Sequence, residues 1–219
     1  GLHGRALPPA IAIKNALPQL TVIAESGDGD TYGEGGNHFI HTMRKNPDIT
    51  NIVHNNMIYG LTKGQASPTS EEGMKNPLQP DGVVTEPFNP LAMAIAGGAT
   101  FVARVFSGDI PQAVAIMKQA ILHEGYALVD VFQPCVVFNK QNTFMWFKEH
   151  TYYLDETHNA TDKAAAMQLA LAEDAFPLGV LYQDTSREAY HKRVRHDAAP
   201  LYQQTVDQQK VKALFEKYV

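Results

Sequence analysis

Short apolar runs and amphipathic stretches alternate along most of the chain. The apolar runs are rich in β-branched and aromatic residues, which predicts β-strands, and the stretches between them have the spacing of helices. The predicted strands cover residues 20–24, 49–54, 101–106 and 126–132, and the predicted helices cover residues 6–15, 36–44, 90–96 and 110–123. Because these strands are apolar throughout, they predict a mainly parallel sheet. The expected fold class is α/β, doubly wound, with helices on both faces of the sheet.

The last third of the chain departs from this alternation. Its predicted parts are an aromatic, irregular segment at residues 144–153, an Ala-rich helix at 161–174, an apolar run at 178–182 and a helix at 206–218. No linker, repeat or low-complexity tract divides the chain. We therefore expect a single domain over residues 1–219, with a C-terminal extension from about residue 140 that forms a subunit interface.

Composition and charge exclude several classes of function. The chain has 219 residues, and its 18 basic and 23 acidic side chains give a formal charge of -5, so it lacks the basic surface of a nucleic-acid-binding protein. No apolar stretch has the length of a membrane-spanning helix, and the first residues do not resemble a signal peptide. Cys135 is the only cysteine, which excludes an internal disulfide. These features favour a protein of the cytoplasm that binds neither nucleic acid nor membrane.

Polar residues follow two of the predicted strands at the points where the strands end. The string Gly27-Asp28-Gly29-Asp30 follows the first strand, and Asn55-Asn56 follows the second. The 28 positions from Asp28 to Asn56 leave room for one helix and one strand, as in a βαβ unit, so both strings would lie at the same edge of the sheet. A carboxylate and an amide oxygen suit Mg²⁺, and glycines let backbone amides approach a diphosphate. The pair of strings predicts a magnesium–diphosphate site, although a GDGD string alone is more often an ordinary turn.

A loop over residues 59–89, rich in Gly, Pro, Ser and Thr, is unusually long for a compact domain. Loops of this length are functional or disordered. Ser67 and Ser70 in this loop have no histidine base nearby in the sequence, so we interpret them as loop caps. His38 and His41 are spaced i, i+3 on a predicted helix, but a zinc site needs further ligands, so we do not assign them to a metal.

The two polar strings resemble the thiamine-diphosphate motif, in which G-D-G is followed, after a helix and a strand, by N-N. Longer strings resemble the β subunit of 2-oxoacid:ferredoxin oxidoreductases over residues 3–139. They are HGRA from His3, SGDGD from Ser26, GGNHFIHTMRKN from Gly35, NNMIYGLTKGQASPTS from Asn55, NPLAMAIAGGATFVAR from Asn89 and QPCVVFN from Gln133. The chain departs from the family pattern at Ile11-Ala12 and at Ala16-Leu17-Pro18, away from the metal motif.

The resemblance implies roles for residues on three segments. Asp28 and Asn56 would bind Mg²⁺ through their side chains, and Ile58 through its backbone carbonyl. The residues implied to bind thiamine diphosphate are His3, Gly27, Asp28, Gly29, Asp30, Asn56, Ile58, Tyr59, Gly60, Leu61 and Thr62. Leu61 and Lys63 would act on the substrate side, Lys63 as a counter-charge for phosphate or for the substrate carboxylate. The alternative for Lys63 is a solvated loop lysine.

The family reaction implies partners as well as cofactors. It is the oxidative decarboxylation of a 2-oxoacid, such as 2-oxoglutarate or pyruvate, to acyl-CoA and CO₂, with electrons passed through iron–sulfur clusters to ferredoxin. No glutamate here is a candidate for activating the aminopyrimidine of thiamine diphosphate, so an α subunit is implied. Two alternatives stay open: a non-redox thiamine-diphosphate enzyme, such as a decarboxylase or carboligase subunit, and a catalytically silent subunit.

Cys135 gains a role only through the resemblance, which makes it one ligand of a [4Fe-4S] cluster. Such a cluster normally needs four thiolates, and the other three are absent from this sequence. Because the chain starts without Met directly before a family string, we expect a fragment of a longer subunit rather than loss of the cluster. The alternative for Cys135 is a small buried apolar residue.

Overall fold

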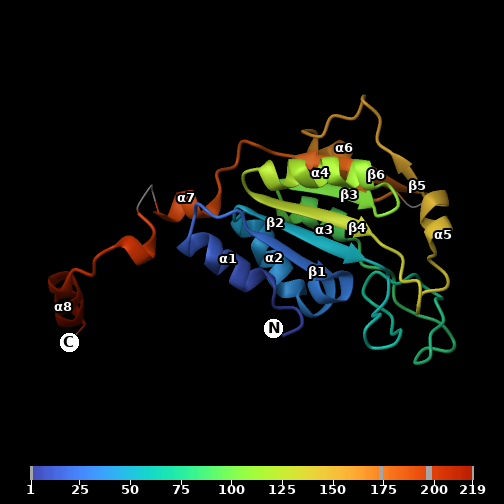
Figure 1. Ribbon diagram of the computed structural model, residues 1–219, viewed down its shortest axis with the longest axis horizontal. Helices are drawn as coiled ribbons and strands as arrows, with labels where there is room; N and C mark the ends of the chain where they lie inside the picture. The colour runs from blue at the N-terminus through green and yellow to red at the C-terminus, as the bar shows by residue number, and fades with distance from the viewer. Residues whose placement is uncertain (1, 173–174, 196–198, 219) are drawn as a thin grey trace.

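A computed structural model describes residues 2–172, 175–195 and 199–218, and it contains one six-stranded sheet (Figure 1). The strands are β1 (Ile23–Gly27), β2 (Ile49–Asn55), β3 (Phe101–Phe106), β4 (Tyr126–Phe132), β5 (Thr151–Tyr153) and β6 (Phe176–Gln183). Their order across the sheet is β1-β2-β4-β3-β6-β5. The first four strands are parallel to one another, whereas β6 is antiparallel to β3 and carries β5 in parallel at the edge. The expected α/β class with a mainly parallel sheet is confirmed.

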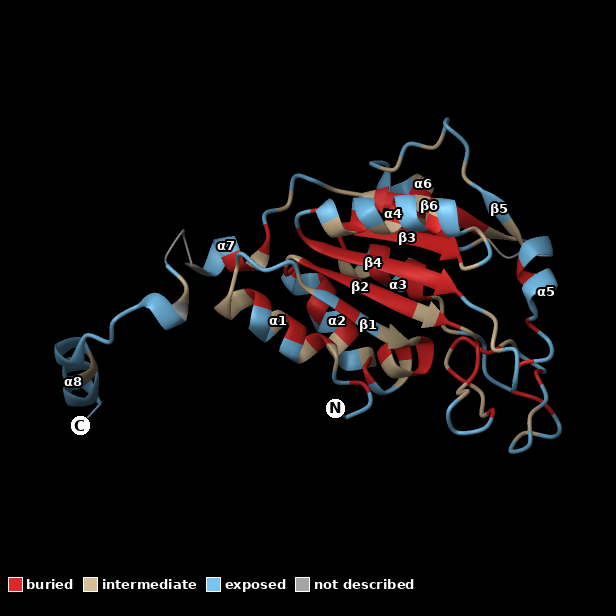
Figure 2. Ribbon diagram, in the orientation of Figure 1, coloured by how far each residue is buried: buried red, intermediate tan, exposed pale blue. Residues whose placement is uncertain are grey.

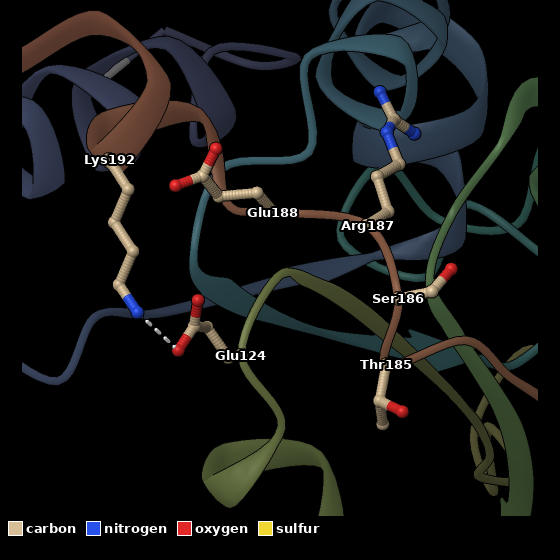
Figure 3. Close-up of a pocket in the computed structure, with 6 residues that line it drawn as sticks. All are labelled: Glu124, Thr185, Ser186, Arg187, Glu188 and Lys192. Carbon is tan, nitrogen blue, oxygen red and sulfur yellow. Dashed lines mark hydrogen bonds and ion pairs between the residues drawn. The ribbon is translucent and has the colours of Figure 1, made fainter. Parts of the chain in front are cut away.

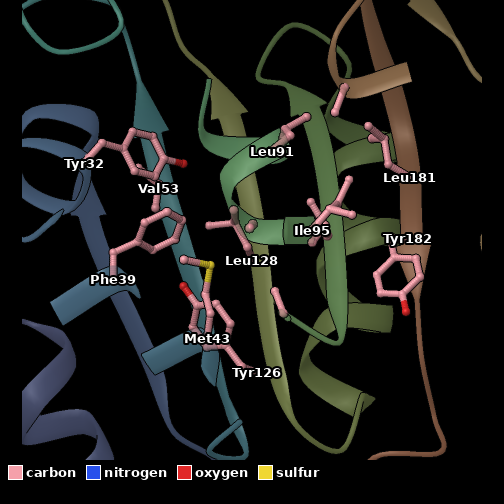
Figure 4. Close-up of a cluster of buried hydrophobic side chains, with 14 of the residues drawn as sticks. Tyr32, Phe39, Met43, Val53, Leu91, Ile95, Tyr126, Leu128, Leu181 and Tyr182 are labelled. Atoms are coloured by element: carbon pink, nitrogen blue, oxygen red, sulfur yellow. The ribbon is translucent and has the colours of Figure 1, made fainter. Parts of the chain in front are cut away.

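Helices cover the sheet on both faces, as expected. The helices are α1 (Leu7–Ala16), α2 (Gly36–Lys45), α3 (Pro90–Gly97), α4 (Ile110–Leu122), α5 (Phe144–Glu149), α6 (Lys163–Ala170), α7 (Tyr190–Arg195) and α8 (Gln208–Lys217), with a π-helical turn η1 (Gly29–Glu34) and a 3-10 turn η2 (Leu201–Gln203). The larger hydrophobic core joins α1, α2, α3 and α6 to one face of the sheet, and Figure 4 shows part of it. The second core lies between α4 and the other face. The central strands are buried throughout, which explains why nearly all of their residues are apolar (Figure 2).

The predicted bounds of the central elements are close to the observed ones, but the first strand is displaced. The prediction placed it at residues 20–24, whereas β1 is Ile23–Gly27 and pairs with β2 over its whole length. The reason is that β1 is an edge strand with an exposed Glu25 and a half-buried Ser26, so its polar residues resemble a turn.

The C-terminal third has more regular structure than the sequence predicted. The segment at residues 144–153 forms helix α5 and edge strand β5 rather than an irregular loop, because Phe147 is fully buried against Phe132 and Phe106. Helix α6 ends at Ala170, and residues 173–174 of the predicted helix lie outside the described residues. Helix α8 buries none of its residues and lies apart from the sheet (Figure 2). The assignment of residues 140–219 to a subunit interface stays a prediction.

No helix within the described ranges combines the length and the apolar character that crossing a membrane requires.

Candidate functional site

The carboxyl ends of β1 and β2 bring the two polar strings together. The parallel register pairs Gly27 with His54, so Asp28, which directly follows β1, and Asn55, the last residue of β2, lie at the same edge of the sheet. In Figure 1 the arrowheads of β1, β2 and β4 point toward the long loop between β2 and α3. The predicted meeting of the strings at one edge of the sheet is therefore confirmed, at the position where ligands bind in such folds.

Asp28 is a buried carboxylate that accepts hydrogen bonds from two hydroxyl groups of the long loop. Its side chain is at the start of η1, and the residue is only 2% exposed. Ser67 Oγ donates to Asp28 Oδ2 at 2.6 Å, and Thr69 Oγ1 donates to the same oxygen at 2.8 Å. Burial raises the pKa of Asp28 above its ordinary value, although both hydroxyls act in the opposite direction. A cation at this carboxylate would offset the cost of its burial, so the donor set fits Mg²⁺.

Asn56 and Ile58 lie on a tight turn directly after β2. Met57 between them has a φ of 57°, a left-handed conformation that is uncommon for a residue other than glycine. This turn brings the Ile58 backbone N–H to Asn56 Oδ1 at 3.1 Å, and Asn139 Nδ2 donates to the Asn56 carbonyl at 3.0 Å. Backbone strain of this kind concentrates at functional sites. The Asn56 side chain and the Ile58 backbone thus occupy one turn, as a shared metal site requires.

The Tyr59 ring packs directly against the backbone of Gly29. A Cβ atom at Gly29 would lie 2.0 Å from the ring, so this position requires glycine while Tyr59 stays there. The Tyr59 hydroxyl donates to the Gly29 carbonyl at 3.3 Å and to the Glu34 carboxylate at 3.1 Å. Gly27, by contrast, is half-buried at the end of β1 and would have no close neighbour at a Cβ except the His54 carbonyl, 3.9 Å away.

The N-terminal residues reach this site through Asp30 and Glu34. His3 Nδ1 lies 2.9 Å from Glu34 Oε2, and its Nε2 lies 3.6 Å from Asp30 Oδ1. The Gly4 backbone N–H donates to the same Asp30 oxygen at 2.7 Å. The structure therefore brings His3 and Asp30 together beside η1, and their assignment to the cofactor site stays a prediction.

Residues 60–63 form the exposed tip of the loop. Leu61 is 99% exposed, and Thr62 and Lys63 are also exposed, with Thr62 bonded to Gln65. Lys63 adopts a left-handed φ of 75°, and its backbone N–H donates to the half-buried Gly60. Within the described residues these side chains form no hydrogen bond with Asp28, Ser67 or Thr69. Their roles toward thiamine and substrate therefore stay predictions.

The long loop is ordered around a small hydrophobic core of its own, which includes Cys135. Ile58, Met74 and Val83 form this core, and Ala66 and Cys135 pack against it. The Cys135 thiol is half-buried next to Gly60, where a Cβ atom would lie 3.4 Å from Sγ. No group of three or more His, Cys, Asp or Glu side chains in the described ranges is placed to hold a metal ion.

Sequence reasoning missed the hydroxyls and the buried charges behind Asp28. Ser70 is a loop cap as expected, because its hydroxyl accepts from the Ser67 backbone N–H at 2.8 Å, but Ser67 itself contacts Asp28. Behind them, Asp130 Oδ2 accepts from Arg104 Nε at 2.8 Å, with neither residue more than 5% exposed. The available signal was a single charge of opposite sign inside each of two apolar strands, FVARVF and YALVDVF.

Two hollows lie at opposite ends of the sheet. One of about 520 Å³ adjoins the Asp28 network and is lined in part by Thr69, Arg104 and Phe176. The other, of about 410 Å³, lies near the start of β4, where Lys192 Nζ is 2.7 Å from Glu124 Oε2 (Figure 3). Arg187 at this hollow donates to the backbone carbonyls that end α2 and α3, a structural role. The hollow beside Asp28 is therefore the one connected to the candidate site.

Comparisons with known proteins agree with this geometry. The family described as the C-terminal TPP-binding domain of thiamine pyrophosphate enzymes matches residues 1–131, and the C-terminal region of the pyruvate ferredoxin oxidoreductase β subunit matches residues 135–198. The chain is 42% identical over 213 residues to the 2-oxoacid:ferredoxin oxidoreductase subunit β of Saccharolobus solfataricus, covering 92% of this chain and 70% of the relative. It is 39% identical over 228 residues to the 2-oxoacid:ferredoxin oxidoreductase subunit β of a Sulfolobus species, covering 99% of this chain and 73% of the relative.

A solved structure is similar over nearly the whole chain. It is a 2-oxoglutarate:ferredoxin oxidoreductase from Magnetococcus marinus with 2-oxoglutarate, coenzyme A and succinyl-CoA bound. The TM-score is 0.91 at 37% sequence identity, and the match covers 97% of this chain and 74% of the other. These relatives support the oxidoreductase rather than the non-redox or silent alternatives. The chain belongs to the family of 2-oxoacid:ferredoxin oxidoreductase β subunits.

Proposed function

We propose that this β subunit binds magnesium and thiamine diphosphate at the carboxyl ends of β1 and β2, through Asp28, Asn56 and the Ile58 carbonyl. The observation that carries the proposal is the buried Asp28 carboxylate, held at the level of Asn55 and Asn56 by the register of the two strands. Three oxygens from one edge of a sheet leave further positions of an octahedral Mg²⁺ site to phosphate oxygens and water. This chain's residues would therefore anchor the diphosphate.

The residues around η1 are proposed to shape the diphosphate pocket. Gly27 and Gly29 allow the backbone to approach phosphate closely, and His3 and Asp30 close the site from the N-terminal side. Tyr59 and Gly60 connect the metal turn to the loop tip at Leu61, Thr62 and Lys63. We assign these three to the thiamine and substrate side, with Lys63 as the cation for the substrate carboxylate.

Bound thiamine diphosphate would supply the electron sink for decarboxylation of a 2-oxoacid. The substrate class is proposed from the names of the relatives, one of which holds 2-oxoglutarate and coenzyme A. We further propose an α subunit as partner and ferredoxin as electron acceptor. A cytoplasmic, reducing setting is part of this proposal, because a cysteine that binds an iron–sulfur cluster must stay reduced.

Cys135 does not by itself fit a [4Fe-4S] cluster, because the sequence has one cysteine and such clusters need four ligands. We propose that Cys135 supplies one ligand and that the remaining thiolates come from outside this sequence.

Native mass spectrometry of the assembly, purified without oxygen, tests the proposed function. The expected spectrum contains a partner subunit, thiamine diphosphate and Mg²⁺ together with this chain, and iron where the cluster is complete. A parallel assay would measure ferredoxin reduction that requires a 2-oxoacid and coenzyme A. An active assembly without thiamine diphosphate would contradict the proposal, as would an assembly that binds the cofactor but does not oxidise any 2-oxoacid.

A further inference from the structure

The Thr69 hydroxyl lies between two acceptors at the candidate metal site. Its Oγ1 is 2.8 Å from Asp28 Oδ2 and 2.9 Å from Asn55 Oδ1. The orientation of the Asn55 amide is fixed, because its Nδ2 donates at 3.1 Å to Asp130 Oδ1, which can only accept as a carboxylate. A threonine hydroxyl has one hydrogen, so beside an ionised Asp28 it donates to the carboxylate, while Asn55 Oδ1 accepts from the Met57 backbone N–H at 3.3 Å.

Asp130, which accepts from the Asn55 amide, is itself held by several buried hydrogen bonds. Asp130 is fully buried in β4, between β2 and β3, and it accepts from Tyr32 OH at 2.9 Å and from Arg104 Nε at 2.8 Å. Strands on either side of β4 thus supply Asn55 and Arg104 to the same carboxylate. These buried hydrogen bonds hold Asn55 in place beside the Thr69 hydroxyl.

We propose that Thr69 is a positioning residue for the metal-binding carboxylate, and that it acts through the hydrogen bond from its hydroxyl to Asp28 Oδ2. The inference rests on the proposed function, since it assumes that Asp28 binds Mg²⁺. Thr69 and Ser67 both donate to Asp28 Oδ2 and so orient the carboxylate that would bind the metal. Groups that orient metal ligands in this way determine how tightly the metal binds.

Thr69→Val tests the proposal, because valine keeps the shape of the side chain and removes the hydroxyl. Thr69→Ser restores the hydroxyl. Thr42→Val is the matched control. Thr42 is also buried and donates to the His38 carbonyl at 2.6 Å, but it lies in α2, away from the candidate metal site. The dissociation constant of Mg²⁺ would be measured by calorimetry on the anaerobically purified assembly with saturating thiamine diphosphate, after thermal melts without ligand.

We expect Thr69→Val to raise the dissociation constant of Mg²⁺ by about 10- to 100-fold, the usual effect of removing a partner of a metal ligand. Thr69→Ser and Thr42→Val should stay near wild type. At saturating Mg²⁺ and thiamine diphosphate, the kcat of Thr69→Val should recover, because positioning affects binding of the metal rather than the chemical step.

Wild-type Mg²⁺ affinity in Thr69→Val would overturn this inference and leave the proposed function standing. An equal loss of Mg²⁺ affinity in Thr42→Val would do the same. Thr69→Ala decides the matter if Thr69→Val does not fold, since it also removes the hydroxyl that donates to Asp28 Oδ2. It should weaken Mg²⁺ binding in the same direction, and unchanged affinity there would overturn the inference. A wild-type assembly that binds no thiamine diphosphate would overturn the proposed function as well.

Discussion

Arg104 and Asp130 form an ion pair inside the sheet, with 2.8 Å between Arg104 Nε and Asp130 Oδ2. They come from the neighbouring strands β3 and β4, whose register places these two residues opposite each other. The Arg104 guanidinium also lies 4.4 Å from the centre of the Phe132 ring and borders the hollow beside the metal site. The pair therefore connects the hydrophobic core to the candidate active site.

Breaking this pair on one side should be costly. Arg104→Met leaves the Asp130 charge buried without its partner, and we expect a loss of about 3–5 kcal/mol in the free energy of unfolding. Chemical denaturation measures the change. The double variant Arg104→Met/Asp130→Asn should recover much of the loss, because it removes both charges and keeps a side-chain oxygen that accepts from Tyr32 and Asn55. A double variant less stable than the single one would contradict this account.

Gly29→Ala should impair cofactor binding, because the new Cβ atom would overlap the Tyr59 ring and displace it from η1. We expect weaker binding of thiamine diphosphate, measured by calorimetry, with the secondary structure retained by circular dichroism. Gly36→Ala is the control, since a Cβ there has no neighbour within 4 Å. Equal cofactor affinity in the two variants would show that the Tyr59–Gly29 contact is irrelevant to the site.

Stability should decrease as the pH falls below about 6.5, partly because of His123. Burial lowers the pKa of this ring below its ordinary value of 6.5, although Asp48, Asp184 and Glu124 act in the opposite direction. The unfolded chain therefore binds a proton at a pH where the folded chain does not, so protonation favours unfolding from about pH 6.5 down to the lowered pKa. In His123→Gln this component should disappear from unfolding free energies measured across that range. A variant with the wild-type pH dependence would rule His123 out as its source.

Lys63→Gln should raise the KM for the 2-oxoacid by roughly 10-fold, the effect of losing one hydrogen bond to a charged group. Binding of thiamine diphosphate should not change, since Lys63 lies at the exposed tip of the loop. Lys75→Gln, another exposed lysine of the same loop, is the control. If both variants keep the wild-type KM, Lys63 is a solvated loop lysine and has no role toward substrate.

The sequence alone was sufficient for the bounds of the central strands and for the meeting of the two polar strings at one edge of the sheet. Strands β3 and β4 are apolar at nearly every position because helices cover both faces, and their predicted bounds match the structure. The position of Asp28 and Asn56 follows from the parallel pairing of β1 and β2, which any βαβ unit imposes. Local patterns of this kind are visible without coordinates.

The partners of Asp28 could not be predicted from local patterns. Ser67 and Thr69 are 39 and 41 positions away in a loop with no periodicity, and only the folded loop brings their hydroxyls to the carboxylate. Edge strand β5 was also missed, because its three residues carry two exposed tyrosines and resemble a loop. Contacts distant in sequence and short edge strands depend on tertiary packing.

Binding of thiamine diphosphate to the Asp28→Asn assembly, measured by calorimetry with and without Mg²⁺, is the most direct test of the proposed site. The account predicts that wild type binds the cofactor in a manner that requires Mg²⁺, whereas Asp28→Asn keeps its fold, judged by circular dichroism, and no longer gains affinity from the metal. Magnesium-dependent binding of wild-type strength in Asp28→Asn would contradict the central claim that Asp28 holds the metal.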